Sequence, residues 1–232
     1  PDWKDARAVP VTDGPFHLDD YVAYGQECIG FLGPDIHVVS VCQPTVPVLA
    51  AISLMAQHGE KTPTTMLMMG GPIDTRRSPT VVNNFALKHP IAWFENRLIS
   101  RVPAKYPGFG RNVYPGFLQL AGFVAMNPDR HIDSHKDYFY HLVKGDGDNA
   151  DAHRKFYDEY NAVMDLPAEY YLDTIQAVFQ EHQLPKGELM VAGERVDPSA
   201  IKTTALFSIE GELDDISGNG QTEAAHGLCT GI

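Results

Sequence analysis

The chain has 232 residues, of which 44% are hydrophobic and 21% charged, a composition that excludes a disordered or fibrous protein. Its formal net charge of −12 repels phosphate groups, so we expect no nucleic acid partner, and no apolar run is long enough to span a bilayer. Three cysteines without a CxxC pair or zinc-finger spacing indicate a reducing compartment rather than a disulfide framework.

The first part of the chain alternates predicted helices and strands. An acidic first turn and a following Gly-Pro pair predict a helix over Leu18–Phe31. Short apolar runs predict buried strands over Ile36–Val41 and Thr64–Met69, with a helix over Thr45–Gln57 between them. A third strand is predicted over Thr204–Ile209. This order predicts an α/β fold with a mostly parallel sheet and helices on both faces.

The stretch over residues 79–198 differs in composition from the rest. It is rich in aromatic residues and reads as helices broken by proline and glycine. We therefore expect a helical insertion over residues 79–198, packed as a cap over the strand ends, between core segments 1–78 and 199–232. Its aromatic side chains are expected to form mainly the core of the cap, and some of them to line a channel.

The most informative segment is the junction at Cys42, where a predicted strand runs directly into a predicted helix. A nucleophile on such a sharp turn is lifted above the sheet, which requires small residues two positions away on either side. Ser40 and Pro44 occupy those positions. The helix N-terminus favours a thiolate, and the backbone N–H of Gln43 is the predicted oxyanion donor. The alternative is a buried cysteine at the end of a core strand.

An acidic turn follows the third predicted strand. In the chain order nucleophile, acid, histidine, Asp214 is the predicted acid, and Asp215 is its competitor. The only later histidine, His226, lies in a pattern that predicts a surface helix. We therefore expect the catalytic histidine to lie outside this chain.

A metal site is the alternative interpretation of the histidines in the insertion. His131 and His135, with Asp133, Asp137 and His141 nearby, could share one helical face. The segment lacks the HExxH order, so a solvated helix is the favoured interpretation. We predict no metal and no cofactor.

Four segments together resemble the intracellular polyhydroxybutyrate depolymerases: residues 38–54, 68–74, 78–83 and 210–216. The resemblance extends over nearly the whole chain. It implies a partial α/β-hydrolase fold with an inserted helical cap and a cysteine in place of the usual serine. It also implies hydrolysis of polymer esters by a Cys-Asp-His triad, with Cys42 as nucleophile and Asp214 as acid. The family histidine and the second oxyanion loop have no counterpart here, so we expect an inactive fragment that lacks both ends.

The resemblance also suggests a partner and a location. It implies a polyhydroxybutyrate granule surface as partner and a cytoplasmic, granule-associated protein. Two alternatives stay open. A polyhydroxyalkanoate synthase-like acyltransferase also uses cysteine, but its nucleophile is flanked by glycines and its acid is typically followed by His-Ile, unlike Asp214-Asp215-Ile216 here. A non-catalytic granule-binding relative is the other.

Overall fold

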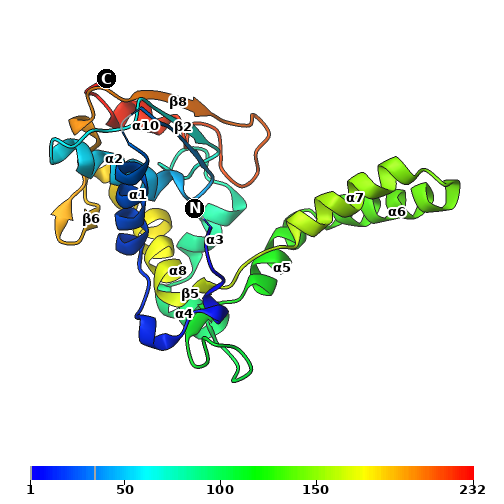
Figure 1. The fold of residues 1–232 in the computed structure, drawn as a ribbon. Helices are drawn as coiled ribbons and strands as arrows, with labels where there is room; N and C mark the ends of the chain where they lie inside the picture. Colours follow the sequence, from blue (N-terminus) through cyan, green and yellow to red (C-terminus); the bar gives the residue numbers. More distant parts are fainter. Residues whose placement is uncertain (1, 34) are drawn as a thin grey trace. The chain divides into compact units, whose positions relative to one another are not determined.

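The structure is a computed structural model that describes residues 2–33 and 35–232. The chain forms two compact units (Figure 1): the first includes Pro15–Arg97 and Glu169–Ile232, and the second comprises Asp2–Gly14 and Leu98–Ala168. The strands are β1 (His37–Val41), β2 (Thr65–Met69), β3 (Ser100–Arg101), β4 (Asn112–Tyr114), β5 (Leu166–Pro167), β6 (Met190–Val191), β7 (Glu194–Arg195) and β8 (Ala205–Ile209). The α-helices are α1 (Leu18–Leu32), α2 (Thr45–Gln57), α3 (Val81–Lys88), α4 (Ile91–Leu98), α5 (Gly116–Met126), α6 (Pro128–Lys144), α7 (Gly147–Tyr160), α8 (Ala168–Thr174), α9 (Gln183–Lys186) and α10 (Ala224–Leu228). A π-helix spans Ile175–Gln180, and short 3₁₀ helices span Ala6–Ala8, Val11–Asp13 and Pro198–Ala200.

The first unit is built on a three-stranded parallel sheet in the order β1-β2-β8. This confirms the predicted strands and their parallel pairing, and α1 and α2 confirm the two predicted helices. The pairing continues beyond the strands, because Cys42 N–H donates to Met69 O (2.8 Å) and Gly70 N–H donates to Ile209 O (2.9 Å). The carboxyl ends of all three strands therefore lie at one edge of the sheet.

Only one face of this sheet is covered in the part of the chain that the structure describes. Aligned residues of neighbouring strands point to the same face. Ser40, Met66 and Met68 are buried on one face, whereas Val39 is 61% and Phe207 is 63% exposed on the other. The prediction of helices on both faces is therefore wrong for these strands. A continuous apolar run predicts burial of every position, but it does not reveal whether a second layer is present.

Helix α2 packs in the core of the first unit. Its sequence is apolar all round, and its side chains are nearly all buried. A helix without a polar face lies in the core rather than at the surface. It packs against α1, and the contact is close because a Cβ at Gly25 of α1 would lie only 3.3 Å from the Cβ of Ala51. This helix begins directly after the Cys42 turn, so the burial of the helix holds one end of that turn in place.

The second unit contains the antiparallel strands β3, β4 and β5 and the helices α5, α6 and α7. Its small apolar cluster consists of Ala6, Val102 and Val113, with Tyr106 packed against them. Figure 1 shows α6 and α7 lying side by side. Among the described residues, no helix combines the length and apolar character needed to cross a lipid bilayer.

The predicted insertion differs from the observed division of the chain. Residues 79–97 and 169–198, which we assigned to the insertion, group with the sheet rather than with the second unit. The aromatic residues of the insertion were expected to form mainly a core. Phe117, Phe139 and Phe156 are instead 69%, 60% and 58% exposed. Aromatic content alone does not distinguish a core residue from an exposed one. That the insertion acts as a cap stays a prediction.

The one-sided burial of the sheet predicts unequal costs of truncation in adjacent strands. Met68→Ala should lower the free energy of unfolding by about 2–5 kcal/mol, because a fully buried side chain leaves a cavity. Val39→Ala should cost less than about 1 kcal/mol, because that side chain is mostly exposed. Urea unfolding monitored by circular dichroism measures both. Equal losses would mean that the open face is packed in solution.

Candidate active site

Cys42 lies on a strained turn between β1 and α2. Its φ angle is 63°, in the left-handed region that costs non-glycine residues free energy. Thr45 holds the turn, since its N–H and its hydroxyl both donate to Cys42 O, at 3.1 and 2.8 Å. Cys42 is exposed. The predicted strand-to-helix turn is thus confirmed, and the alternative of a buried core cysteine is wrong.

The two flanking residues fit the turn for different reasons. Ser40 is buried, and its hydroxyl donates to Leu67 O of the neighbouring strand (3.3 Å). Pro44 adopts a helical conformation directly before α2, where a backbone N–H has no helical partner. A small residue before the turn and a proline after it are therefore both compatible with the conformation of Cys42.

The electrostatics at the sulfur differ from the expectation. Although the residue is exposed, the surrounding atoms desolvate the sulfur and raise the pKa of the Cys42 thiol; the negative charge of Asp214 raises it further. A hydrogen bond from the Gln43 N–H lowers this pKa but does not offset the other two effects. Desolvation and the Asp214 charge thus oppose the expected thiolate, which stays a prediction. That the Gln43 N–H would stabilise an oxyanion stays a prediction.

Asp214 lies on the turn after β8, at the same edge of the sheet as Cys42. Its Oδ1 accepts the N–H groups of Ile216 (2.9 Å) and Ser217 (3.0 Å). Its Oδ2 faces Gly70, where an added Cβ would lie 3.5 Å away. The turn itself therefore orients the carboxylate, and Oδ2 is directed to the end of β2.

Cys42 and Asp214 stand on either side of β2. β1, which ends at Cys42, is an edge of the described sheet, and β2 separates it from β8. The charge of Asp214 nevertheless reaches the Cys42 thiol. The structure thus brings the two predicted residues to one place, and their catalytic roles stay predictions.

None of the described histidines is hydrogen-bonded to Cys42 or Asp214. His226 is exposed on α10, and its Nε2 lies 3.1 Å from the Ser208 hydroxyl, consistent with the predicted surface helix. His182 is buried, with its Nδ1 2.9 Å from the Thr75 hydroxyl. Within residues 2–33 and 35–232, no histidine forms a hydrogen bond to Cys42 or Asp214.

His131 and His135 of α6 contact residues of α7. His131 Nδ1 lies 2.9 Å from the Tyr157 hydroxyl, and the ring of His153 stacks on Tyr138 with centroids 4.5 Å apart. His135 meets His153 edge to face at 5.0 Å. The described part of the chain contains no group of three or more His, Cys, Asp or Glu residues arranged to hold a metal ion.

An aromatic residue near the thiol was missed by the sequence reasoning. Tyr170 of α8 is buried and interacts electrostatically with Cys42. Burial raises the pKa of Tyr170 far above its usual value, so the phenol stays neutral. Its ring stacks on Tyr21 at 5.6 Å and meets Phe16 edge to face at 5.8 Å. The sequence shows only that this segment is aromatic, not that one tyrosine approaches Cys42.

A polar network beside the turn was also missed. It consists of Glu210 and Thr222 with the backbone of Gly71, Gly220 and Glu223. The sequence signal that could have revealed it is the glycine pair at 70–71 directly after a strand, which indicates close approach of another segment.

The charge interaction between the two residues makes a direct prediction. Asp214→Asn removes a negative charge beside the sulfur, so the thiol pKa should fall and the thiolate fraction at neutral pH should rise. Iodoacetamide should then modify Cys42 about two- to tenfold faster, measured by mass spectrometry of the Cys42 peptide. Asp215→Asn is the matched control and should have a smaller effect. An unchanged rate in Asp214→Asn would show that the carboxylate lies away from the thiol.

Comparison with known proteins places the chain in a family. The family described as PHB de-polymerase C-terminus matches residues 70–232, which is more than half of the chain. This region contains Asp214 but not Cys42, so the match is independent of the cysteine turn. A search of the curated proteins finds no match. On the family match, the chain belongs to the polyhydroxybutyrate depolymerase family defined by that C-terminal region.

Proposed function

We propose that Cys42 is the nucleophile and Asp214 the acid of an enzyme that hydrolyses ester bonds of polyhydroxybutyrate. The observation that supports this most strongly is that Cys42 is an exposed residue on a turn with positive φ, at the sheet edge where Asp214 also lies. Backbone strain of this kind is concentrated at functional sites. The family match supports the substrate class.

The raised thiol pKa constrains how the sulfur would react. Burial and the charge of Asp214 raise the pKa of the Cys42 thiol, so in the proposed mechanism a base takes the proton of the sulfur as it attacks the ester carbonyl. The carbonyl oxygen becomes an oxyanion that the Gln43 N–H stabilises. As the C–O bond breaks, the protonated base returns the proton to the alkoxide and a thioester remains. Water then attacks the thioester, gives a proton to the base, and the C–S bond breaks to release the acid and restore the thiol.

The base in this proposal is a histidine that the described residues do not bring to the site. Asp214 would orient it through Oδ2, since Oδ1 already accepts two backbone N–H groups. We further propose that the protein acts in the cytoplasm on the surface of storage granules.

The test uses the full reading frame that contains this chain. Brief incubation with a 3-hydroxybutyrate oligomer, followed by acid quench, should leave one hydroxyacyl group on the peptide that contains Cys42. Cys42→Ala should abolish both this adduct and the release of 3-hydroxybutyrate from amorphous polymer, a loss of about 10³-fold or more. Cys28→Ala, which removes the other exposed cysteine, is the control and should retain activity.

Three results would contradict the proposal in different ways. Hydrolysis that survives in Cys42→Ala would remove Cys42 as the nucleophile. An adduct that is transferred to an alcohol and not to water would indicate an acyltransferase. Granule binding by the unaltered protein without any turnover would indicate a non-catalytic relative.

A further inference from the structure

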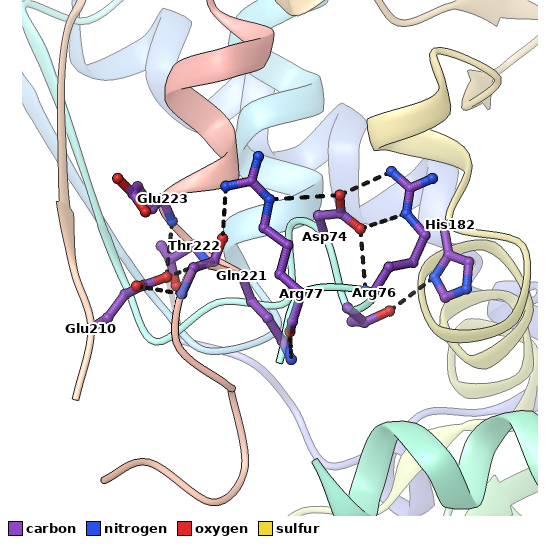
Figure 2. A network of polar contacts seen from close by, with 10 residues as sticks. Asp74, Arg76, Arg77, His182, Glu210, Gln221, Thr222 and Glu223 are labelled. Atoms are coloured by element: carbon purple, nitrogen blue, oxygen red, sulfur yellow. Dashed lines mark hydrogen bonds and ion pairs between the residues drawn. The ribbon is translucent and has the colours of Figure 1, made fainter. Parts of the chain in front are cut away.

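The carboxylate of Glu210 organises the segment that follows the Asp214 turn (Figure 2). Its Oε1 accepts the N–H groups of Thr222 (2.6 Å) and Glu223 (2.9 Å), and its Oε2 accepts the N–H of Gly220 (2.7 Å). Charged acceptors form stronger hydrogen bonds than neutral ones. Glu210 follows β8 directly and precedes Asp214 by one short turn. It thus ties the end of β8 to residues 220–223.

Thr222 continues this connection to the end of β2. Its hydroxyl accepts the N–H of Gly71 (2.7 Å) and donates to Gly71 O (3.0 Å), so one side chain binds both polar groups of a single residue. Thr222 is fully buried. Gly71 O also accepts the Ile73 N–H (3.0 Å), so loss of the hydroxyl removes the partner of the Gly71 N–H in the low dielectric of the interior.

Gly71 in turn contacts the helix that starts at the cysteine turn. Its backbone approaches the side chain of Thr45 so closely that a Cβ at position 71 would have no space. The Thr45 hydroxyl donates to Cys42 O (2.8 Å). A continuous series of contacts therefore leads from Cys42 through Thr45, Gly71 and Thr222 to Glu210, and it joins the carboxyl ends of all three strands.

The loop that contains Gly71 is also fixed at its far end. Asp74 forms two hydrogen bonds to the Arg76 guanidinium, at 2.7 and 2.9 Å, and its N–H donates to Gln221 O (3.1 Å). Figure 2 shows a further link, in which Gln221 Nε2 donates to Arg77 O of this loop (3.0 Å). The loop therefore does not adjust independently when Thr222 changes.

We propose that Thr222 and Glu210 are positioning residues of the candidate site: they hold the Asp214 turn at a fixed separation from Cys42. The effect of these residues on the rate of hydrolysis rests on the proposed function, whereas their effect on the distance between Asp214 and Cys42 does not. A triad tolerates little displacement, and a misplacement of about 1 Å can cost about 10²-fold in rate.

A matched control separates positioning from general stability. Thr204 precedes β8 at the opposite end of the sheet and is also fully buried. Its hydroxyl lies 2.7 Å from Pro63 O and 2.8 Å from the Thr62 hydroxyl. Thr204→Val and Thr222→Val thus remove the same group from equally buried sites with two hydrogen bonds each. Thr222 lies at the end of the sheet where Cys42 and Asp214 lie, whereas Thr204 lies at the opposite end.

The first measurement uses the 232-residue chain and does not require catalysis. The rate of Cys42 alkylation is followed against pH for the unaltered chain, Asp214→Asn, Thr222→Val and Thr204→Val. Thr222→Val should raise the rate at neutral pH by about twofold or more, towards the Asp214→Asn profile, because the carboxylate moves away from the thiol. Thr222→Ser and Thr204→Val should keep the unaltered profile.

The second measurement is ester hydrolysis by the full reading frame, at a temperature where circular dichroism shows each variant folded. Thr222→Val should lower kcat about 10- to 100-fold with KM nearly unchanged, and Thr222→Ser should restore most of it. Thr204→Val should change kcat less than about threefold. Glu210→Gln, which places an NH₂ donor against backbone N–H groups, is the second variant and should resemble Thr222→Val.

Different results would contradict the positioning role and the proposed function. Equal effects of Thr222→Val and Thr204→Val on the alkylation profile and on kcat would overturn the positioning role. An alkylation profile that is unchanged in both Thr222→Val and Glu210→Gln would overturn it as well. If the unaltered protein does not hydrolyse the polyester, the proposed function fails, and the alkylation profiles alone decide the positioning role.

Discussion

The positive φ angle of Cys42 is the constraint on which the site depends. A side chain in this conformation costs about 1–3 kcal/mol relative to an ordinary backbone, so surrounding contacts must hold it. Those contacts are the hydrogen bond from Cys42 N–H to Met69 O (2.8 Å) and the two bonds from Thr45 to Cys42 O. As a result, Cys42 departs from the strand conformation and lies as an exposed residue at the sheet edge.

The same edge determines the chemistry that the sulfur can perform. Desolvation by the surrounding atoms and the charge of Asp214 both oppose ionisation, and a single N–H from Gln43 does not reverse this. The proposed mechanism therefore uses a base that takes the proton during attack, which is the role of histidine in serine-type hydrolysis. Asp214 Oδ2 is directed to the end of β2, and we propose that it orients this base.

Local sequence signals predicted the elements of the site, and tertiary contacts determined the rest. The strands, the helix over Thr45–Gln57 and the turn at Cys42 follow from short patterns of apolar and small residues, and the structure confirms them. The open face at Val39 and the exposed Phe139 depend on which layers are present, and an apolar pattern does not encode that. The approach of Thr222 to Gly71 joins residues 151 positions apart, so no local pattern could reveal it.

The central claim, that the turn at Cys42 holds a strained left-handed backbone to present the sulfur, is tested most directly by comparing Cys42→Gly with Cys42→Ala. Glycine adopts positive φ without the Cβ penalty, so Cys42→Gly should unfold at higher urea concentration than Cys42→Ala, by about 1 kcal/mol. At an ordinary backbone position the order is reversed, because alanine loses less conformational entropy on folding. A Cys42→Ala variant that is the more stable of the two would contradict the account.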